Sequence, residues 1–298
     1  MARLTLRPMT LLEQSVSTGQ VRLTDLFSKD ISVGGMGGPT VPEYAELIVK
    51  GGWPALQRLN ATAAMDALTD YVDNLADVDL RTLDGRPDPI RMTALLRALA
   101  RNTSTEAALQ KLATEAEIPS GNLSVPTVRK YLDQLTRIFV LEELPAWKPH
   151  IRSSIQTRVK PKWHFIDPSL ATAALGISAD RLLEDLNAMG LLFESMVVRD
   201  LRVYADIVDA RVFHYRDSSG LEIDAIVERR DGAWIGVEVK LGGEKAIEEA
   251  VVNFGKLRTR LTDRRLGHLA AFCVVTGGQT SYTRPDGIHV ISLGHLRT

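Results

Sequence analysis

Three charged residues interrupt two apolar runs in LEIDAIVERRDGAWIGVEVKLGG, residues 221–243. Asp224 lies in the first run, and Glu238 and Lys240 lie in the second. Two neighbouring carboxylates stay ionised together only when a cation lies close to both, and Mg²⁺ or Mn²⁺ meets this need better than a lysine. A water bound to such an ion can attack phosphorus, while the lysine stabilises charge that develops on the phosphate. The three residue types therefore predict a metal-dependent phosphodiesterase site, and a structural ion cluster on a half-exposed sheet remains open as the alternative.

The turn between the two runs decides whether these side chains can meet. A three-residue loop, residues 230–232, matches the type I turn and glycine bulge that joins many antiparallel strands, with Gly232 at positive φ. This loop places Asp224 opposite Glu238, with Cβ atoms roughly 5 Å apart on one face. Lys240 lies two residues further along and therefore on the same face. A two-residue loop would mix the faces, so the charge pattern favours the three-residue loop.

The elements around this hairpin predict one α/β domain over residues 175–298. Apolar spacing alternates between helical and strand periods in the order α-β-β-β-α-β-β, which is typical of a single sheet covered by helices. The hairpin supplies the second and third strands of this order. The expected helices are residues 181–205 and 244–261, and the remaining strands are residues 211–217, 269–278 and 287–293.

The middle of the chain predicts three short helices followed by a β-hairpin. Ser104 and Ser124 are the expected N-caps of the second and third helices. Two strand-like runs, VLEELPAW and KWHFID, come next. This order is the pattern of a winged helix, which we expect over residues 61–170.

Basic residues gather where a winged helix would approach a nucleic acid. The segment between the two strand-like runs contains no acidic residue, and its cations are able to contact phosphates. A solvated surface loop and a protein-interaction surface remain open as alternatives. The candidate nucleic-acid-binding residues are Arg129, Lys130, Arg152, Arg158, Lys160 and Lys162.

Composition restricts the classes of function. The net charge is −1, so no overall positive field attracts the chain to nucleic acid or membrane, and any such contact needs a local patch. The single cysteine, Cys273, excludes an internal disulfide and a cysteine-based zinc site. No apolar run approaches the roughly 18 residues of a membrane span, and the N-terminus lacks the apolar core of a signal peptide. We expect a cytoplasmic protein with no membrane partner.

The charged motif resembles that of the PD-(D/E)XK nuclease superfamily, with Asp224, thirteen intervening residues and then EVK. The predicted α-β-β-β-α-β order also resembles the core of that superfamily. The resemblance implies catalytic roles for Asp224, Glu238 and Lys240, with a divalent metal held by the two carboxylates. Many members add a glutamate on the preceding helix, and Glu194 in LLFESMVVRDL matches that position as a further ligand. The proline that usually precedes the aspartate is absent, because Ile223 stands there.

Longer stretches resemble the C-terminal half of bacterial AAA-type or archaeal-type ATPases that carry a DUF4143 domain. The resemblance implies a remnant of an ATPase core strand and helical lid at residues 1–60, before the winged helix and the nuclease-like domain. The glycine-rich stretch at residues 32–40, expected to be a loop, has no lysine for a P-loop, and ATP is therefore not supported as a cofactor. A fragment, a misassigned start and a stand-alone form all remain open. The matching stretches are MARLTLRPMTLLEQ, GGWPALQR, KYLDQLTRIFVLEELPAW, FIDPSLATAALG, LLFESMVVRDL, FHYRDSSGLEIDAIVE and GVEVKLGG.

Three classes of function follow from the sequence. The first is a magnesium-dependent nuclease acting on DNA or RNA. The second is a non-catalytic module that binds DNA or a partner protein, which the near-neutral charge favours slightly. The third is an ATPase subunit whose nucleotide site lies on another polypeptide. We also expect exposed apolar surface on residues 1–60, leading to self-association or local disorder.

Overall fold

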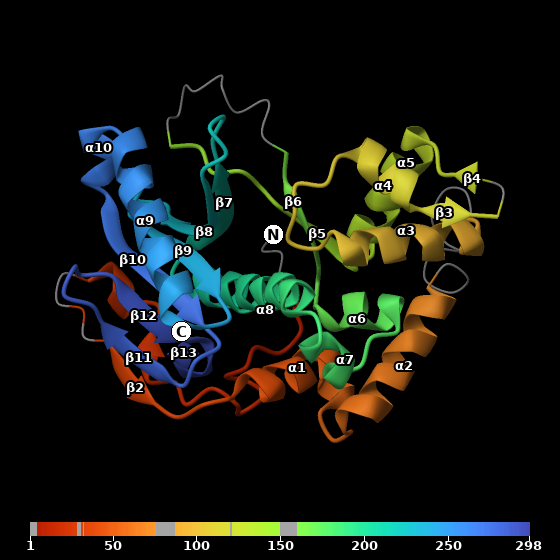
Figure 1. Ribbon diagram of the computed structural model, residues 1–298, viewed down its shortest axis with the longest axis horizontal. Coiled ribbons are helices and arrows are strands. Elements are labelled where there is room, and N and C mark those ends of the chain that lie inside the picture. The colour runs from red at the N-terminus through yellow and green to blue at the C-terminus, as the bar shows by residue number, and fades with distance from the viewer. Residues whose placement is uncertain (1–4, 29–30, 32, 76–86, 120, 150–159) are drawn as a thin grey trace. The chain divides into compact units, whose positions relative to one another are not determined.

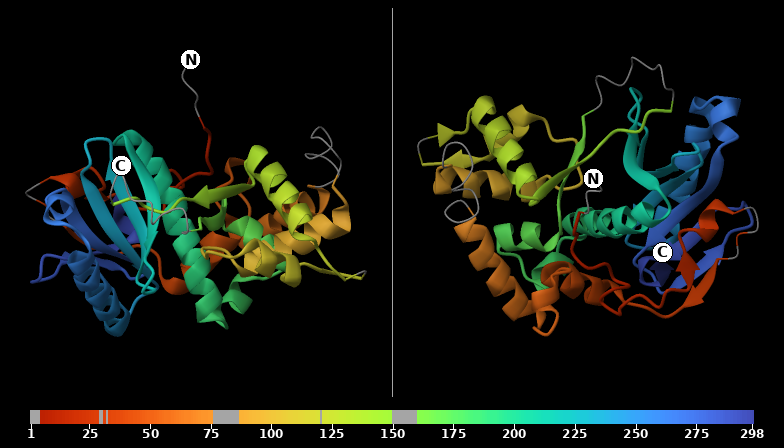
Figure 2. Two further views of the ribbon diagram at one scale, coloured as in Figure 1. Left: turned by 90° about the horizontal axis from the view of Figure 1, so that it is seen from above. Right: turned by 180° about the vertical axis from the view of Figure 1, so that it is seen from behind.

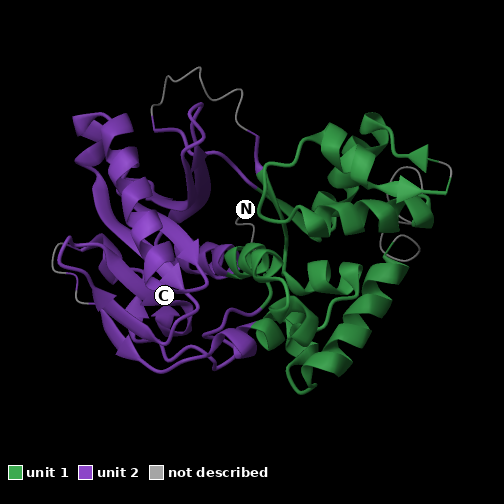
Figure 3. Ribbon diagram, viewed as in Figure 1, with its two compact units in different colours: residues 1–8, 45–143, 162–196 green, residues 9–44, 144–161, 197–298 purple. Residues whose placement is uncertain are grey.

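The chain folds into two compact units, which are coloured separately in Figure 3. Unit 1 comprises residues 1–8, 45–143 and 162–196, and unit 2 comprises residues 9–44, 144–161 and 197–298. These units cut across the ranges 1–60, 61–170 and 175–298 expected from the sequence, because residues 9–44 join the C-terminal part of the chain. The computed structural model describes residues 5–28, 31, 33–75, 87–119, 121–149 and 160–298.

Unit 2 is built on a mixed seven-stranded sheet (Figure 1), with the order β2-β11-β12-β10-β9-β8-β7. Strand β10 runs parallel to both of its neighbours, whereas the other pairs are antiparallel. The mixed α/β class predicted from the sequence is confirmed at this level. The strands are β2 (Gly34–Met36), β7 (Ala210–Arg216), β8 (Glu222–Arg229), β9 (Trp234–Lys240), β10 (Leu269–Thr276), β11 (Thr280–Thr283) and β12 (His289–Ser292).

The β8–β9 hairpin has the register that the sequence predicts. Ala225 lies opposite Val237, and the ladder continues without a shift toward the turn. Three residues close that turn, and the last of them, Gly232, has a φ of +88°. Asp224 and Glu238 directly follow this pair on the side away from the turn, and Nζ of Lys240 lies within 3.8 Å of a carboxylate oxygen of each.

Helix α9 (Glu244–Arg260) packs against β8, β9 and β10 and buries an aromatic cluster beneath it. The rings of Phe254 and Phe272 stack with centroids 4.3 Å apart, and Trp234 meets Phe272 edge-on at 5.8 Å. A short helix, α10 (Asp263–Leu266), leads into β10. The aromatic packing fixes α9 over the hairpin, and with it every side chain that this helix directs toward the sheet.

Two N-terminal strands explain why residues 9–44 belong to unit 2. Strand β1 (Val21–Arg22) pairs in parallel with β13 (Leu296–Arg297), and β2 pairs with β11 at the edge of the large sheet. The expectation of a loop at residues 32–40 is corrected here, since β2 is formed by its glycines. Short 3₁₀ helices lie at η1 (Asp25–Phe27) and η4 (Leu293–His295).

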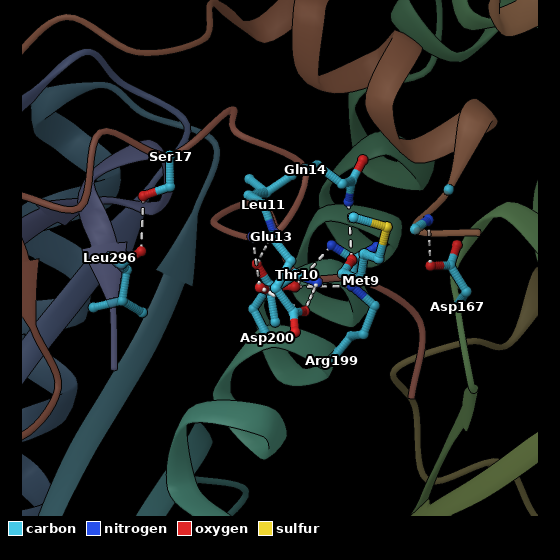
Figure 4. A network of polar contacts seen from close by, with 12 residues as sticks. Met9, Thr10, Leu11, Glu13, Gln14, Ser17, Asp167, Arg199, Asp200 and Leu296 are labelled. Atoms are coloured by element: carbon cyan, nitrogen blue, oxygen red, sulfur yellow. Dashed lines mark hydrogen bonds and ion pairs between the residues drawn. The ribbon is translucent and has the colours of Figure 1, made fainter. Parts of the chain in front are cut away.

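A buried polar network holds the N-terminal segment in place (Figure 4). The carboxylate of Asp200, on helix α8 (Leu186–Ile207), accepts the backbone N–H of Leu11 at 2.9 Å and the Nε–H of Arg199 at 2.8 Å. Ser17 donates to the backbone carbonyl of Leu296 at 2.8 Å. Because these groups are buried, their hydrogen bonds specify where the N-terminal segment docks.

Unit 1 is mostly helical, and α6 packs against both α2 and α3 (Figure 2). The amphipathic spacing predicted from the sequence appears as α2, α3 and α5, which bury apolar side chains along one face each. None of the described helices has the length and hydropathy needed to cross a membrane. The elements are α1 (Val41–Lys50, at the boundary with unit 2), η2 (Pro54–Leu56), α2 (Ala61–Asn74), α3 (Pro89–Arg101), α4 (Leu109–Glu115), β3 (Glu117–Ile118), β4 (Gly121–Asn122), α5 (Val125–Arg137), α6 (Ser169–Leu175) and α7 (Ala179–Leu183).

Two strands follow the helices of unit 1. Strand β5 (Leu141–Leu144) pairs with β6 (Lys162–Phe165), and Thr105, between α3 and α4, forms an antiparallel bridge to Trp163. Ser124 caps α5 as expected. The N-cap expected at Ser104 is corrected: its backbone N–H donates to the carbonyl of Trp163, and α4 starts five residues later.

The turn glycine provides a direct test of the hairpin geometry. We expect Gly232→Ala to lower the free energy of unfolding by roughly 1–2 kcal/mol, because an L-residue at positive φ is strained. Gly255→Ala is the matched control, at an exposed position inside α9. There alanine should raise the free energy of unfolding by roughly 0.5–1 kcal/mol. Urea denaturation measures both, and equal effects of the two substitutions would contradict the assigned turn.

Candidate functional site

The two predicted carboxylates lie at the end of the β8–β9 hairpin that is remote from the turn. Facing β7, strand β8 has one extra residue between Ile223 and Ile226, so the ladder shifts beside Asp224. The Oδ2 atom of Asp224 accepts the backbone N–H of Val239 at 2.7 Å. This hydrogen bond holds the Asp224 carboxylate against β9.

Lys240 brings the two carboxylates together. Its Nζ lies 2.7 Å from Oε2 of Glu238 and 3.8 Å from Oδ2 of Asp224. All three side chains come from adjacent strands and meet at one point, as the pairing in the sequence predicted. The lysine thus supplies the cation that two neighbouring carboxylates need.

Glu238 is the most deeply buried member of this cluster, with 2% of its surface exposed. Burial is the main cause that raises the pKa of Glu238 to about 8, and the nearby charge of Asp224 acts in the same direction. Lys240 opposes that rise. At neutral pH the metal-free site therefore favours a protonated Glu238, and any ligand that needs its carboxylate must displace a proton.

Asn253 is a member of the site that sequence reasoning missed. Its side-chain amide donates to Oε1 of Glu238 at 3.1 Å. A signal was present, because Asn253 lies three residues after Ala250 and four before Leu257, within the apolar face of α9. A polar residue on a buried helical face calls for a polar partner on the sheet.

The donor set can be compared with what Mg²⁺ or Mn²⁺ requires. Two carboxylates are enough for a magnesium ion that keeps several waters. Among the described residues, no group of three or more His, Cys, Asp or Glu side chains is placed to hold a metal ion. An ion that uses Oε2 of Glu238 must take the position of the Lys240 ammonium. The described residues therefore form no closed protein cage, and a magnesium ion held by the two carboxylates would take its other ligands from water or a phosphate.

Glu194, expected as a further metal ligand, forms an ion pair in unit 1. Its Oε1 lies 2.7 Å from Nζ of Lys162, and both side chains are buried. Lys162, expected to contact nucleic acid, is only 1% exposed and is thereby removed from the predicted phosphate-binding surface. Lys162 is buried because β6 faces the interior along its whole length. Its charge is balanced by Glu194 on α8.

The other candidate nucleic-acid-binding residues differ in their placement. Arg129 and Lys130 are exposed on α5, and Lys160 is exposed before β6. Arg152 and Arg158 lie outside the described residues.

The raised pKa of Glu238 gives a pH-dependent stability. The folded state binds the Glu238 proton more tightly than the unfolded state does. The stabilisation that this proton contributes is therefore complete below about pH 4.5 and is lost as the pH rises to about 8. The limiting slope is about 1.4 kcal/mol per pH unit. Glu238→Gln cannot ionise, and its free energy of unfolding should exceed that of the wild type increasingly toward pH 8. Urea denaturation with a chelator at several pH values measures this difference.

Glu249→Gln, at an exposed position of α9, is the control for loss of one carboxyl group. Its stability should follow the wild type across the pH range. If Glu238→Gln also stayed parallel to the wild type, the proton would not reside on Glu238.

Comparison with known proteins yields two families, both of unknown function. Residues 41–181 match the domain of unknown function DUF8612, and residues 189–296 match the domain of unknown function DUF4143. Uncharacterized proteins Rv2008c of Mycobacterium tuberculosis and Mb2031c of Mycobacterium bovis are each 26% identical over 179 residues. This similarity covers 60% of the present chain but 37% of each relative. No solved structure matches.

Asp224, Glu238, Lys240 and Asn253 all lie within the second matched range. Residues 189–296, the C-terminal part of the chain, therefore match the DUF4143 family.

Proposed function

We propose that the C-terminal part of the chain is a PD-(D/E)XK nuclease-like domain that cleaves phosphodiester bonds in nucleic acid with a divalent metal. The observation that carries the proposal is the convergence of Asp224 and Glu238 on Nζ of Lys240. The element order α8-β7-β8-β9-α9-β10, with only the short α10 inserted before β10, supports it, because it resembles the core of that nuclease superfamily.

The proposed chemistry assigns one task to each side chain. Asp224 and Glu238 would hold Mg²⁺ or Mn²⁺, which when bound supplies positive charge and makes its water more acidic. Lys240, displaced from Glu238, donates a hydrogen bond to a phosphate oxygen and stabilises its developing charge. Asn253 keeps the Glu238 carboxylate oriented throughout, in the way that groups behind metal ligands fix their geometry.

Metal binding tests this proposal directly. Calorimetric titration of Mn²⁺ should show saturable binding that tightens between pH 6.5 and pH 8.5, because Glu238 must lose a proton first. Asp224→Asn and Glu238→Gln should each weaken binding at least tenfold, and the exposed control Glu249→Gln should not. Cleavage of end-labelled DNA and RNA, single- and double-stranded, then identifies the substrate. Absence of saturable binding, or equal binding by all variants, would refute the metal site.

A second function is supported by the surface of α5. We propose that residues 61–170 form a winged helix that binds nucleic acid, whether or not the C-terminal site cleaves it. Within this range the order α3, α4, α5 and the paired strands β5 and β6 supports this, as does the antiparallel bridge from Thr105 to Trp163. Arg129, Lys130 and Arg137 are exposed on α5. Such a helix presents cations to phosphates.

Salt dependence of DNA binding tests the α5 surface. Arg129→Gln/Lys130→Gln should weaken binding of a labelled duplex and reduce the slope of log K against log salt by about 1–2, as expected for two lost phosphate contacts. The control is Lys245→Gln/Arg264→Gln, which removes the same charge from exposed positions of α9 and α10. Fluorescence anisotropy measures both. Equal slopes for the two double variants would argue against α5 as the contact surface.

A further inference from the structure

A cavity of about 380 Å³ opens in unit 2, between the end of the β7–β8 connection and helix α9. Asn253 lines this cavity and also donates to Glu238 of the carboxylate cluster, so one side chain links the two places. Its lining residues are Ser219, Gly220, Leu221, Glu222, Asn253, Lys256 and Arg260.

Two cations face this cavity from α9. Lys256 and Arg260 are separated by four residues, which places them on one side of the helix about 6 Å apart along its axis. Lys256 is exposed and forms no ion pair with any other described residue. The guanidinium of Arg260 stays 3.7 Å from Oδ2 of Asp217, and about half of its side chain is exposed. Both cations are therefore positioned to bind an anion from solvent.

The acidic residues nearby are already engaged. Asp217 accepts hydrogen bonds from the backbone and hydroxyl of Ser219 and from the backbone N–H of Leu221. The hydrogen bonds from Ser219 are the main contributions that keep the pKa of Asp217 below its usual value, although burial opposes them. The one carboxylate in the lining, Glu222, lies 3.7 Å from a guanidinium nitrogen of Arg216. Lys256 and Arg260 thus dominate the charge that the cavity offers to a ligand.

The geometry points to a phosphate-binding subsite in this cavity, where Lys256 and Arg260 hold a nucleic-acid strand next to the carboxylate cluster. This inference rests on the proposed nuclease function and names the part of the site that positions its substrate. Asn253 lines the cavity and bonds Glu238, which supports a strand that lies in the cavity and passes beside the carboxylates. Exposed cations beside polar residues suit a phosphodiester rather than an apolar ligand.

The test is binding of a fluorescein-labelled 12-nucleotide single-stranded DNA, measured by anisotropy in EDTA at low salt. Lys256→Gln/Arg260→Gln should weaken binding at least tenfold relative to the wild type. Lys245→Gln/Arg264→Gln removes equal charge outside the cavity and should change binding less than threefold. Circular dichroism checks that both variants fold. Equal losses in the two variants, no loss in the first, or no measurable wild-type binding would overturn the subsite.

A separate measurement keeps this inference distinguishable from the proposed function. Mn²⁺ titration of the wild type and Asp224→Asn in the absence of DNA reports on the carboxylates alone. If the metal binds saturably and Lys256→Gln/Arg260→Gln leaves DNA binding unchanged, the subsite is refuted and the metal site is retained. Absent metal binding together with DNA binding that requires both cations would overturn the nuclease site and retain a strand-binding cavity.

Discussion

The register of the β8–β9 hairpin is the constraint on which the candidate site depends. A shift of one residue would turn every side chain of one strand to the opposite face and separate Asp224 from Glu238. The three-residue turn at Gly232 prevents that shift, and the bond from the Val239 N–H to Asp224 fixes the far end. Lys240 lies two residues after Glu238 on β9, and its Nζ therefore reaches both carboxylates.

The second constraint is electrostatic. Glu238 is buried beside another carboxylate, an arrangement that opposes its ionisation and contributes unfavourably to folding at neutral pH. Packing elsewhere in the domain must offset this unfavourable contribution to folding, and the stacked rings of Phe254 and Phe272 supply such packing. Phe254 directly follows Asn253, so the packing that secures α9 also positions the amide that bonds Glu238. A buried carboxyl group whose pKa is strongly raised is typical of functional sites.

Segments distant in sequence complete the sheet that carries the site. Residues 9–44 add β2 to this sheet beside β11, pair β1 with β13 in a separate two-stranded sheet, and place the backbone N–H of Leu11 at the buried Asp200. The same α9 that covers the hairpin lines the cavity through Lys256 and Arg260. One helix therefore connects the core, the carboxylate cluster and the proposed strand-binding surface, which places substrate positioning and domain stability on the same element.

The sequence by itself determined the hairpin, its turn, the meeting of Asp224, Glu238 and Lys240, and the order of the longer elements α8, β7, β8, β9, α9, β10 and β12, but not the short α10, β11 and β13. These features are local: they follow from turn chemistry, from the two-residue period of strands and from the apolar stripes of helices. Only the tertiary structure decided the partners of isolated residues. In that structure Glu194 pairs with Lys162, and Asn253 donates a hydrogen bond to Glu238. The glycine-rich stretch forms an edge strand. Such contacts join residues far apart in the chain, so local spacing does not encode them. They form because a polar group that becomes buried when the elements pack needs a hydrogen-bond partner.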